Sequence, residues 1–331
     1  MSRKGRTLQT RFANVGGDDV HDFNTTFTVF TATHNRANTL VRVRDSLDVQ
    51  TFRDFEWIVV DDGSTDDTRQ HVERWQQDAS FPIRYFFQEN SGKHVAFNRA
   101  VRHARGALFL NLDSDDECAP EALERLHDWW QAIPEPERDD FSAVTTLCRD
   151  QTGALLGTRF PESPLDCTSI EMRWKHKVKG EKWGFHRTDV LRQHPFPEPE
   201  GVKFVSESIV WRAIDKRFKT RFVNEVLRTY WVGETGKPNL STITPGVLEG
   251  RVMFHAQTLN DLTEWFPVNP TAFVAAAVNL TRYRIQQGKR VGEILATVQG
   301  PWIKLLVALS LPVGAVVALR DQRRRRSEAS A

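Results

Sequence analysis

Residues 110–116 read Leu-Asn-Leu-Asp-Ser-Asp-Asp, so an apolar run that begins at residue 107 ends in three carboxylates within four positions. The apolar run predicts a short buried strand. In an extended chain Asp113 and Asp115 would lie on the same side, about 7 Å apart. Like charges at that distance repel, and a bound cation relieves the repulsion; Mg²⁺ or Mn²⁺ prefers such oxygen ligands. The alternative is an Asp-rich turn that caps the next helix, which Pro120 begins.

The composition of the 331-residue chain is that of a globular protein, with 40% hydrophobic and 10% aromatic residues. A chain of this length can bury a sizeable core. The formal net charge of +2 does not predict a nucleic-acid partner. The three cysteines, Cys118, Cys148 and Cys167, form neither a CxxC metal pattern nor a disulfide framework, which is typical of a reducing cytosol. The polar residues 1–22 lack the apolar core of a signal peptide.

Strands and helices are expected to alternate along the first part of the chain. The strands are expected at 27–31, 55–60, 82–88 and 107–110, and the helices at 39–50, from Ser64 or Thr65 to about 77, and at 94–103. This alternation predicts an α/β fold with a mostly parallel sheet flanked by helices. A further strand at 141–147 is expected to join the sheet.

Polar side chains follow each predicted strand: His34, then Asp61 and Asp62, then Lys93, then the carboxylates from Asp113 onward. In sheets of this kind, ligands bind beyond the carboxyl ends of the strands. The sequence therefore predicts a site at this edge of the sheet.

Four motifs at these strand ends together resemble the family 2 glycosyltransferases of the GT-A fold. They are TATHNR at 31–36, DDGSTDDT at 61–68, NSGKHVAFNRA at 90–100 and LDSDD at 112–116. The resemblance is strongest over 27–133 and continues to about 232 through EKWGFHR and FVSESIVWRAI. It implies two halves, 26–133 for the nucleotide sugar and 134–250 for the acceptor. Residues 1–25 are expected to form a flexible arm, and residues 251–331 a C-terminal helical extension.

The implied activity is metal-dependent, inverting transfer of a sugar from a nucleotide-diphosphate sugar, UDP-linked, to a hydroxyl of a glycan or lipid-linked acceptor. The alternative is a catalytically inactive protein of the same fold that binds a nucleotide sugar or a glycan. A dinucleotide-binding oxidoreductase is disfavoured because the first strand-to-helix turn has no GxGxxG motif. A phosphorelay receiver domain, suggested by Asp61 and Asp62, would leave the later motifs unexplained.

The resemblance also implies which residues bind the nucleotide sugar: Thr33, His34, Asn35, Asp62, Lys93, Asp113 and Asp115. His34 occupies the place of a Tyr that packs on the base, and Asp62 that of the carboxylate that binds the base edge. The alternatives are a packed structural histidine and a helix N-cap. The metal, Mg²⁺ or Mn²⁺, is expected on Asp115 and Asp116.

Lys93 follows Gly92 at a strand-to-helix turn, where backbone N–H groups and a cation favour phosphate. The family commonly has Ala-Arg-Asn in this helix, whereas this chain has Ala96-Phe97-Asn98. We therefore expect Lys93 to be the phosphate cation.

On the acceptor side, the resemblance places Glu207 as the base that takes the proton of the attacking hydroxyl. The family commonly carries a second acid there, where this chain has Ser208. The alternative for Glu207 is a first-turn residue favoured by the helix dipole. Trp183 and His186 are expected to line the acceptor cleft, although a core position is the alternative for Trp183.

The segment 302–319 is almost wholly apolar and is followed by Arg320 and Arg323–Arg326. Its length is near the lower limit for spanning a bilayer, and Lys304 and Pro312 disfavour a span. A helix at the membrane surface, with its arginines at anionic headgroups, fits equally well. A buried C-terminal helix is the third interpretation. We expect membrane association through 302–326, at the cytoplasmic face.

Overall fold

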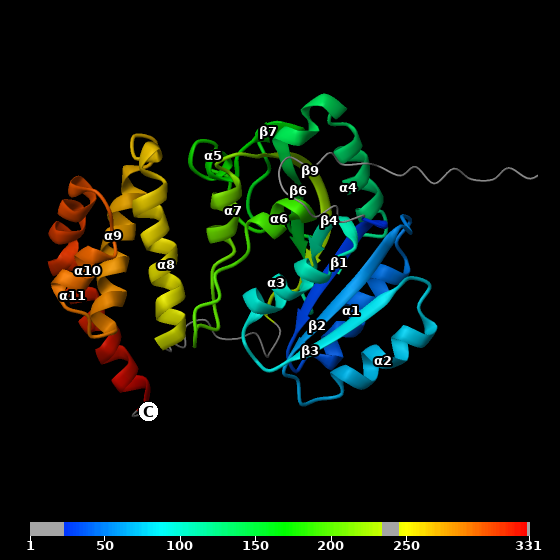
Figure 1. The fold of residues 1–331 in the computed structure, drawn as a ribbon, viewed down its shortest axis with the longest axis horizontal. Helices are drawn as coiled ribbons and strands as arrows, with labels where there is room; N and C mark the ends of the chain where they lie inside the picture. The colour runs from blue at the N-terminus through cyan, green and yellow to red at the C-terminus, as the bar shows by residue number, and fades with distance from the viewer. Residues whose placement is uncertain (1–22, 234–244, 330–331) are drawn as a thin grey trace, which may run out of the picture.

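The structure is a computed structural model that describes residues 23–233 and 245–329, and these residues fold around one mixed sheet (Figure 1). The strands of the sheet follow the order β3-β2-β1-β4-β8-β6-β9-β5, and β7 pairs with β9 outside this path. Their bounds are β1 Thr25–Thr33, β2 Phe55–Asp62, β3 Ile83–Gln88, β4 Gly106–Asn111, β5 Glu117–Cys118, β6 Phe141–Asp150, β7 Leu165–Cys167, β8 Lys182–Arg187 and β9 Lys219–Tyr230.

Eleven α-helices accompany the sheet in the described part of the chain. They are α1 Ala37–Asp48, α2 Thr68–Asp78, α3 Lys93–His103, α4 Ala122–Gln131, α5 Ser169–Trp174, α6 Thr188–Gln193, α7 Ser208–Ile214, α8 Pro245–Asp261, α9 Pro270–Gln286, α10 Val291–Ala296 and α11 Pro301–Ala329. Helices α8 to α11 pack together beside the sheet-containing part, at the left of Figure 1.

The strands β3, β2, β1 and β4 form the parallel part of the sheet, which confirms the predicted α/β fold. Every residue of β2 is buried, as the continuous apolar sequence of a parallel strand covered on both faces requires. The register pairs Thr33 with Asp61 and Asp62 with Gln88. The polar residues that follow these strands therefore meet at one edge.

The second part of the sheet reverses direction. Strand β8 runs antiparallel to both β4 and β6, while β6 and β9 are parallel. Gly184 in β8 makes this close approach possible, because a Cβ there would lie 1.9 Å from the carbonyl oxygen of Val144. The sheet is thus continuous between the two predicted halves of the domain, whose division stays a prediction.

The loops after β1 and β2 differ from the expected helix starts. Helix α1 begins at Ala37, whose N–H donates to the Asp66 carboxylate at 3.0 Å. The prediction that Ser64 or Thr65 caps the next helix is wrong, because α2 begins at Thr68 and its N-cap is Asp67. Instead, Ser64 Oγ accepts from the N–H of Asn35, at 2.8 Å. The polar motif that follows β2 therefore holds the loop after β1 in place.

Candidate active site

A cavity of about 810 Å³ opens beside the ends of β4 and β8 and continues toward α8 and α9. Five of the predicted site residues line it: Lys93, Asp113, Trp183, His186 and Glu207. They come from the α3 start, the turn after β4, strand β8 and the segment before α7. The structure thus brings residues from both predicted halves of the domain to one cavity.

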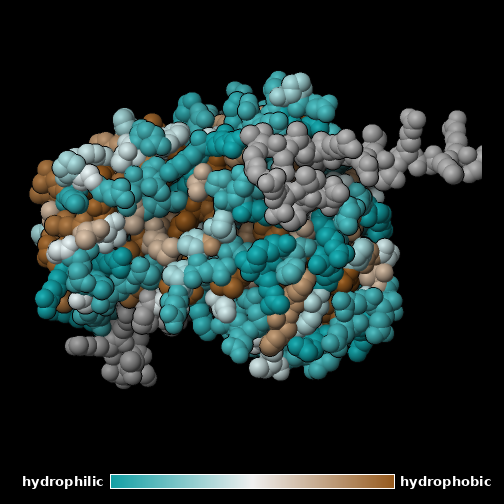
Figure 2. Space-filling model, in the orientation of Figure 1, coloured by the Kyte–Doolittle hydropathy of each residue, from teal (hydrophilic) through white to brown (hydrophobic). Residues whose placement is uncertain are grey.

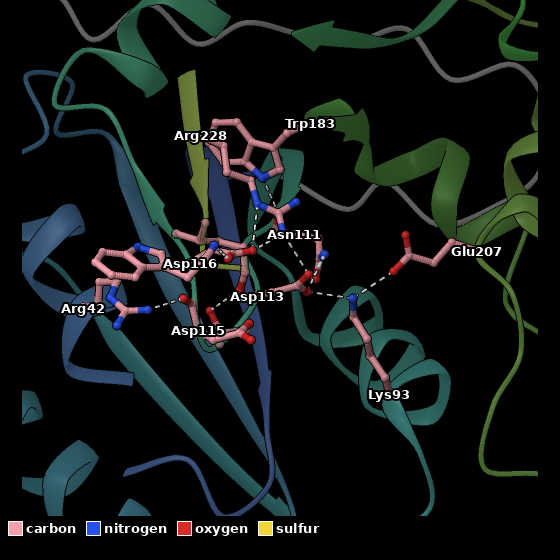
Figure 3. A network of polar contacts seen from close by, with 12 residues as sticks. Arg42, Lys93, Asn111, Asp113, Asp115, Asp116, Trp183, Glu207 and Arg228 are labelled. Atoms are coloured by element: carbon pink, nitrogen blue, oxygen red, sulfur yellow. Dashed lines mark hydrogen bonds and ion pairs between the residues drawn. The ribbon is translucent and has the colours of Figure 1, made fainter. Parts of the chain in front are cut away.

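The carboxylates after β4 lie in a turn rather than along a strand. Strand β4 ends at Asn111, and the N–H of Asp116 donates to the carbonyl of Asp113 at 3.1 Å. Asp113 accepts from Lys93 Nζ at 2.7 Å and from the Arg228 guanidinium at 2.9 Å (Figure 3). Burial alone would raise the pKa of Asp113, but these two cations hold it well below its usual range.

Asp116 is fully buried and points away from the cavity, toward β9. One carboxylate oxygen forms an ion pair with Arg228, and the other accepts from the N–H of Trp231 at 3.0 Å. Burial raises the pKa of Asp116 to about 6 despite this contact. In this geometry the Asp116 carboxylate is engaged by Arg228 and by the N–H of Trp231, and its expected role as a metal ligand stays a prediction. The turn after β4 directs this side chain inward, where the guanidinium of Arg228 is its partner.

Asp115 forms an ion pair with Arg36 at 2.6 Å, and the Arg42 guanidinium donates to its backbone carbonyl (Figure 3). Among residues 23–233 and 245–329, no three His, Cys, Asp or Glu side chains are grouped to hold a metal ion. The oxygen ligands of Asp113 and Asp115 nevertheless suit Mg²⁺ or Mn²⁺, because such ions often bind one or two carboxylates and complete their coordination with substrate phosphates and water.

Asp62 ties the end of β2 to the start of α3. Its carboxylate accepts from Gln88 Nε2 and from the N–H groups of Ser91 and Gly92, each at 2.8 Å. Gly92 has a φ of 101°, a conformation that favours glycine. The alternative of a helix N-cap on α2 does not apply, since Asp62 is bonded to the loop before α3. Its contact with a base stays a prediction.

His34 and Asn35 lie in the loop beside Asp62. The His34 Nδ1 atom is 2.9 Å from the carbonyl oxygen of Asp62, and Asn35 Oδ1 accepts from the N–H of Thr65 at 2.7 Å. Thr33, at the end of β1, is buried, and its hydroxyl has no hydrogen-bond partner in the described part of the chain. These residues lie together at the strand edge, as predicted, but outside the cavity lining.

We expect Asp62→Ala to weaken UDP binding by about 1–3 kcal/mol. The N–H groups of the base and of the loop before α3 would both lose the carboxylate that accepts their hydrogen bonds. The same change should lower the melting temperature, since Gln88, Ser91 and Gly92 lose an acceptor. Calorimetric titration with UDP measures the first effect and thermal unfolding the second. Asp66→Ala is the matched control: Asp66 caps α1, so its loss should lower stability and spare UDP affinity. A folded Asp62→Ala protein with unchanged UDP affinity would place the base elsewhere.

Lys93 joins the donor-side and acceptor-side carboxylates. Its Nζ atom lies 2.7 Å from Asp113 Oδ1 and 2.9 Å from Glu207 Oε1 (Figure 3). Burial alone would lower the pKa of Lys93, but the two carboxylates raise it above its ordinary value, so the side chain stays charged. Glu207 itself is nearly half exposed and faces the cavity.

Trp183 and His186 occupy the cavity wall in different ways. Trp183 is buried, and its Nε1 donates to the carbonyl of Asn111 at 2.6 Å, so it mainly fixes the end of β4. His186 stacks on Trp211, with ring centroids 4.1 Å apart. Burial lowers the pKa of His186 to about 3, so the ring is neutral at pH 7. Acceptor contacts by Trp183 and His186 stay predictions.

Two residues at the site were not predicted. Arg228 pairs with Asp113 and Asp116 across more than one hundred positions of sequence, and no local pattern indicates such a pairing. Trp211 could have been found, because it follows Glu207 in the predicted acceptor motif and lies one helical turn into α7.

The class of fold follows from comparison with solved structures. The structure of TarS 1–349 of S. aureus in complex with UDP-GlcNAc matches with a TM-score of 0.60 and 18% identity, over 90% of this chain and 92% of that one. A mannosyltransferase of Pyrobaculum calidifontis, in complex with GDP-Man and Mn²⁺, matches with a TM-score of 0.51 and 19% identity, over 94% and 91%. The fold is therefore the GT-A fold of nucleotide-sugar transferases, as the sequence predicts.

The family follows from the sequence comparisons. Residues 28–186 match the model described as glycosyl transferase family 2, so this chain contains a domain of that family. An uncharacterized glycosyltransferase of Nostoc is 37% identical over 31% of this chain and 32% of its own length. A GalNAc(5)-diNAcBac-PP-undecaprenol β-1,3-glucosyltransferase of Campylobacter jejuni is 27% identical over 61% and 63%. A poly(ribitol-phosphate) β-N-acetylglucosaminyltransferase of Staphylococcus aureus is 33% identical over 55% and 31%. Each match thus spans less than two thirds of the relative.

Proposed function

We propose that this protein transfers a sugar, with inversion, from a UDP-linked donor to a hydroxyl of a glycan or lipid-linked acceptor. The observation that carries the proposal is the position of Lys93 between Asp113 and Glu207 at the wall of the cavity. Inverting transfer requires a cation for the donor diphosphate and a carboxylate that takes the proton of the acceptor hydroxyl as this hydroxyl attacks the anomeric carbon. The names of the two relatives with assigned acceptors support this class of acceptor.

Each residue has a defined task in this proposal. Lys93, at the N-terminus of α3, binds the donor diphosphate, whose negative charge grows as the nucleotide leaves. Glu207 accepts the proton of the acceptor hydroxyl as it attacks. A metal ion on Asp115, with Asp113 nearby, would neutralise charge on the departing diphosphate when bound. The neutral His186 and its partner Trp211 offer a flat surface for a sugar ring.

A screen of nucleotide sugars tests the proposal directly. Full-length protein is incubated with UDP-, GDP- and ADP-sugars, with Mn²⁺ or with EDTA, and nucleotide release is measured. We expect release from a UDP-sugar with Mn²⁺ and loss of this release in EDTA. NMR of the transferred sugar should show an anomeric configuration opposite to that of the donor. Absence of binding to any nucleotide sugar would refute the proposal, and retention of configuration would refute inversion.

The membrane association is proposed through α11. In the described part of the chain, Pro301–Arg324 is long and apolar enough to cross a membrane by length and composition. One face of α11 packs on α9: a Cβ at Gly314 would lie 2.7 Å from the Thr281 side chain, and Asp321 pairs with Arg282 at 2.6 Å. A spanning helix would have to leave these contacts. We therefore propose that α11 lies along the membrane surface.

The other face of α11 carries an exposed apolar stripe, at the part of the molecule where Figure 2 shows hydrophobic surface over the C-terminal helices. The stripe consists of Leu305, Leu309, Val313, Val316 and Leu319, each at least half exposed. Arg320, Arg323 and Arg324 place positive charge at one end of it, which suits anionic headgroups. The cytoplasmic face is proposed because all three cysteines are free and buried.

We expect the triple variant Leu305→Gln/Leu309→Gln/Val316→Gln to bind phosphatidylglycerol vesicles at least tenfold more weakly, because each side chain loses its transfer into the lipid boundary. Co-sedimentation measures the binding, and phosphatidylcholine vesicles should bind the wild-type protein less well. The control Val49→Gln alters an equally exposed apolar residue after α1 and should change nothing. Equal sedimentation of the triple variant and wild type would contradict the membrane proposal.

A further inference from the structure

The end of the cavity that lies away from Lys93 reaches into the C-terminal helices. This distal wall is formed by α5, α7, α8 and α9 through Trp174, Arg212, Phe254, His255, Thr258 and Ala276. Most of these side chains are apolar or aromatic. Arg212 is the exception, because its guanidinium is positively charged.

Arg212 lacks a carboxylate partner among the residues that the structure describes. Its guanidinium donates to the Thr258 hydroxyl at 2.9 Å and lies 4.2 Å from the centroid of the Phe254 ring. The nearest acid along α7 is Asp215, and its carboxylate accepts instead from Ser169 and from the N–H of Ile170. The guanidinium therefore has no direct ion pair among the described residues, although the charge of Asp215 acts on it from a distance.

A partly buried cation without a direct ion pair is costly to retain, and the charge of Asp215 offsets this cost only from a distance. Burial lowers the pKa of Arg212 to about 10, which still leaves the side chain charged at pH 7. Its neighbour His255 adds no second positive charge, since burial lowers the pKa of that ring to about 4 and keeps it neutral. An anion that enters the cavity would recover the energy spent on desolvating Arg212. A planar guanidinium is suited to bind two oxygens of a phosphate at once.

We propose that Arg212 forms an anion subsite that binds a phosphate of the acceptor, at the opposite end of the cavity from the donor diphosphate. The subsite rests on the proposed function, since it assigns the acceptor class of the same cavity. It implies that the accepting hydroxyl and the phosphate belong to one molecule long enough to reach from Glu207 to α8. The phosphate could come from a polyol phosphodiester or from a lipid diphosphate, and both share the chemistry that Arg212 recognises.

The test measures anion binding to full-length protein in saturating UDP, so that the donor site is filled. Two probes are titrated calorimetrically: glycerophosphoglycerol, a polyol phosphodiester, and geranyl diphosphate, a short lipid diphosphate. We expect the wild-type protein to bind one of them and Arg212→Met to bind it at least tenfold more weakly. The tighter probe identifies the source of the phosphate. UDP affinity measured alone should be the same in both proteins.

Two further variants keep the test decisive. Arg217→Met removes an exposed cation just beyond α7 and should bind the probe within twofold of wild type. Arg212→Lys keeps the positive charge but cannot bind two phosphate oxygens at once as the planar guanidinium does, so an intermediate affinity is expected. This variant keeps the test valid even if Arg212→Met unfolds. Equal probe binding by the Arg212 variants and wild type would overturn the inference. So would a wild-type protein that binds UDP but neither probe, whereas failure to bind UDP or any other nucleotide would refute the proposed function itself.

Discussion

Replacing Glu207 by Gln is expected to lower the rate of sugar transfer by about 10²–10⁴-fold, the usual contribution of general-base catalysis. Glutamine has nearly the same size and can still accept a hydrogen bond from Lys93, but it cannot take up a proton at neutral pH. Donor binding should stay within a few-fold of wild type, because Lys93 and Asp113 remain in place. The transfer rate with saturating donor and the donor affinity by titration together measure this contrast.

The matched control for Glu207 is Asp189→Asn. Asp189 is a carboxylate on the acceptor side of the sequence, but it pairs with Arg187 at 2.6 Å and does not line the cavity. Its replacement should leave transfer within a few-fold of wild type. A Glu207→Gln protein that transfers sugar at the wild-type rate would move the base to another residue, and loss of both transfer and donor binding would indicate a folding defect instead.

Replacing Arg228 by Met is expected to lower the free energy of unfolding by about 3–5 kcal/mol, because it leaves the buried carboxylate of Asp116 without a counter-charge, whereas Asp113 keeps Lys93. Arg228 is buried and pairs with both Asp113 and Asp116. Methionine preserves much of the volume, so the loss reports mainly on charge. Urea unfolding followed by tryptophan fluorescence measures the effect.

The control for Arg228 is Arg125→Met. Arg125 pairs with Glu225 at 2.6 Å, but it is over a third exposed, so its loss should cost only about 1 kcal/mol. The double variant Arg228→Met/Asp116→Asn should regain part of the stability, since one buried charge is then removed. A single Arg228→Met variant as stable as Arg125→Met would show that the carboxylate turn does not depend on this guanidinium.

The parallel half of the fold could be predicted because its strands are buried on both faces and carry continuous apolar runs. The predicted strand at 55–60 lies within β2, and the predicted helix at 94–103 differs from α3 by one residue. The positions of Asp62 and Lys93 at one edge followed from the same argument, since parallel strands end together.

The parts that could not be predicted depend on contacts between distant segments. The placement of Asp113 and Asp115 on one side assumed an extended chain past Asn111, whereas the chain turns there. Ser64 or Thr65 was expected to cap a helix, but the partner of both is Asn35, which follows another strand. Local sequence gives the hydrogen-bonding capacity of such residues, whereas only the assembled sheet decides which partner they meet.

The pairing of Asp116 with Arg228 also has a consequence during synthesis. The two residues are 112 positions apart. At about 5–20 residues per second, the guanidinium leaves the ribosome roughly 6–22 s after the carboxylate. During this interval the nascent chain holds all strands of the parallel part but has no β9 to neutralise the acidic turn. A chain arrested before residue 228 should therefore remain sensitive to protease at the turn after β4, and protection should appear only once β9 has emerged.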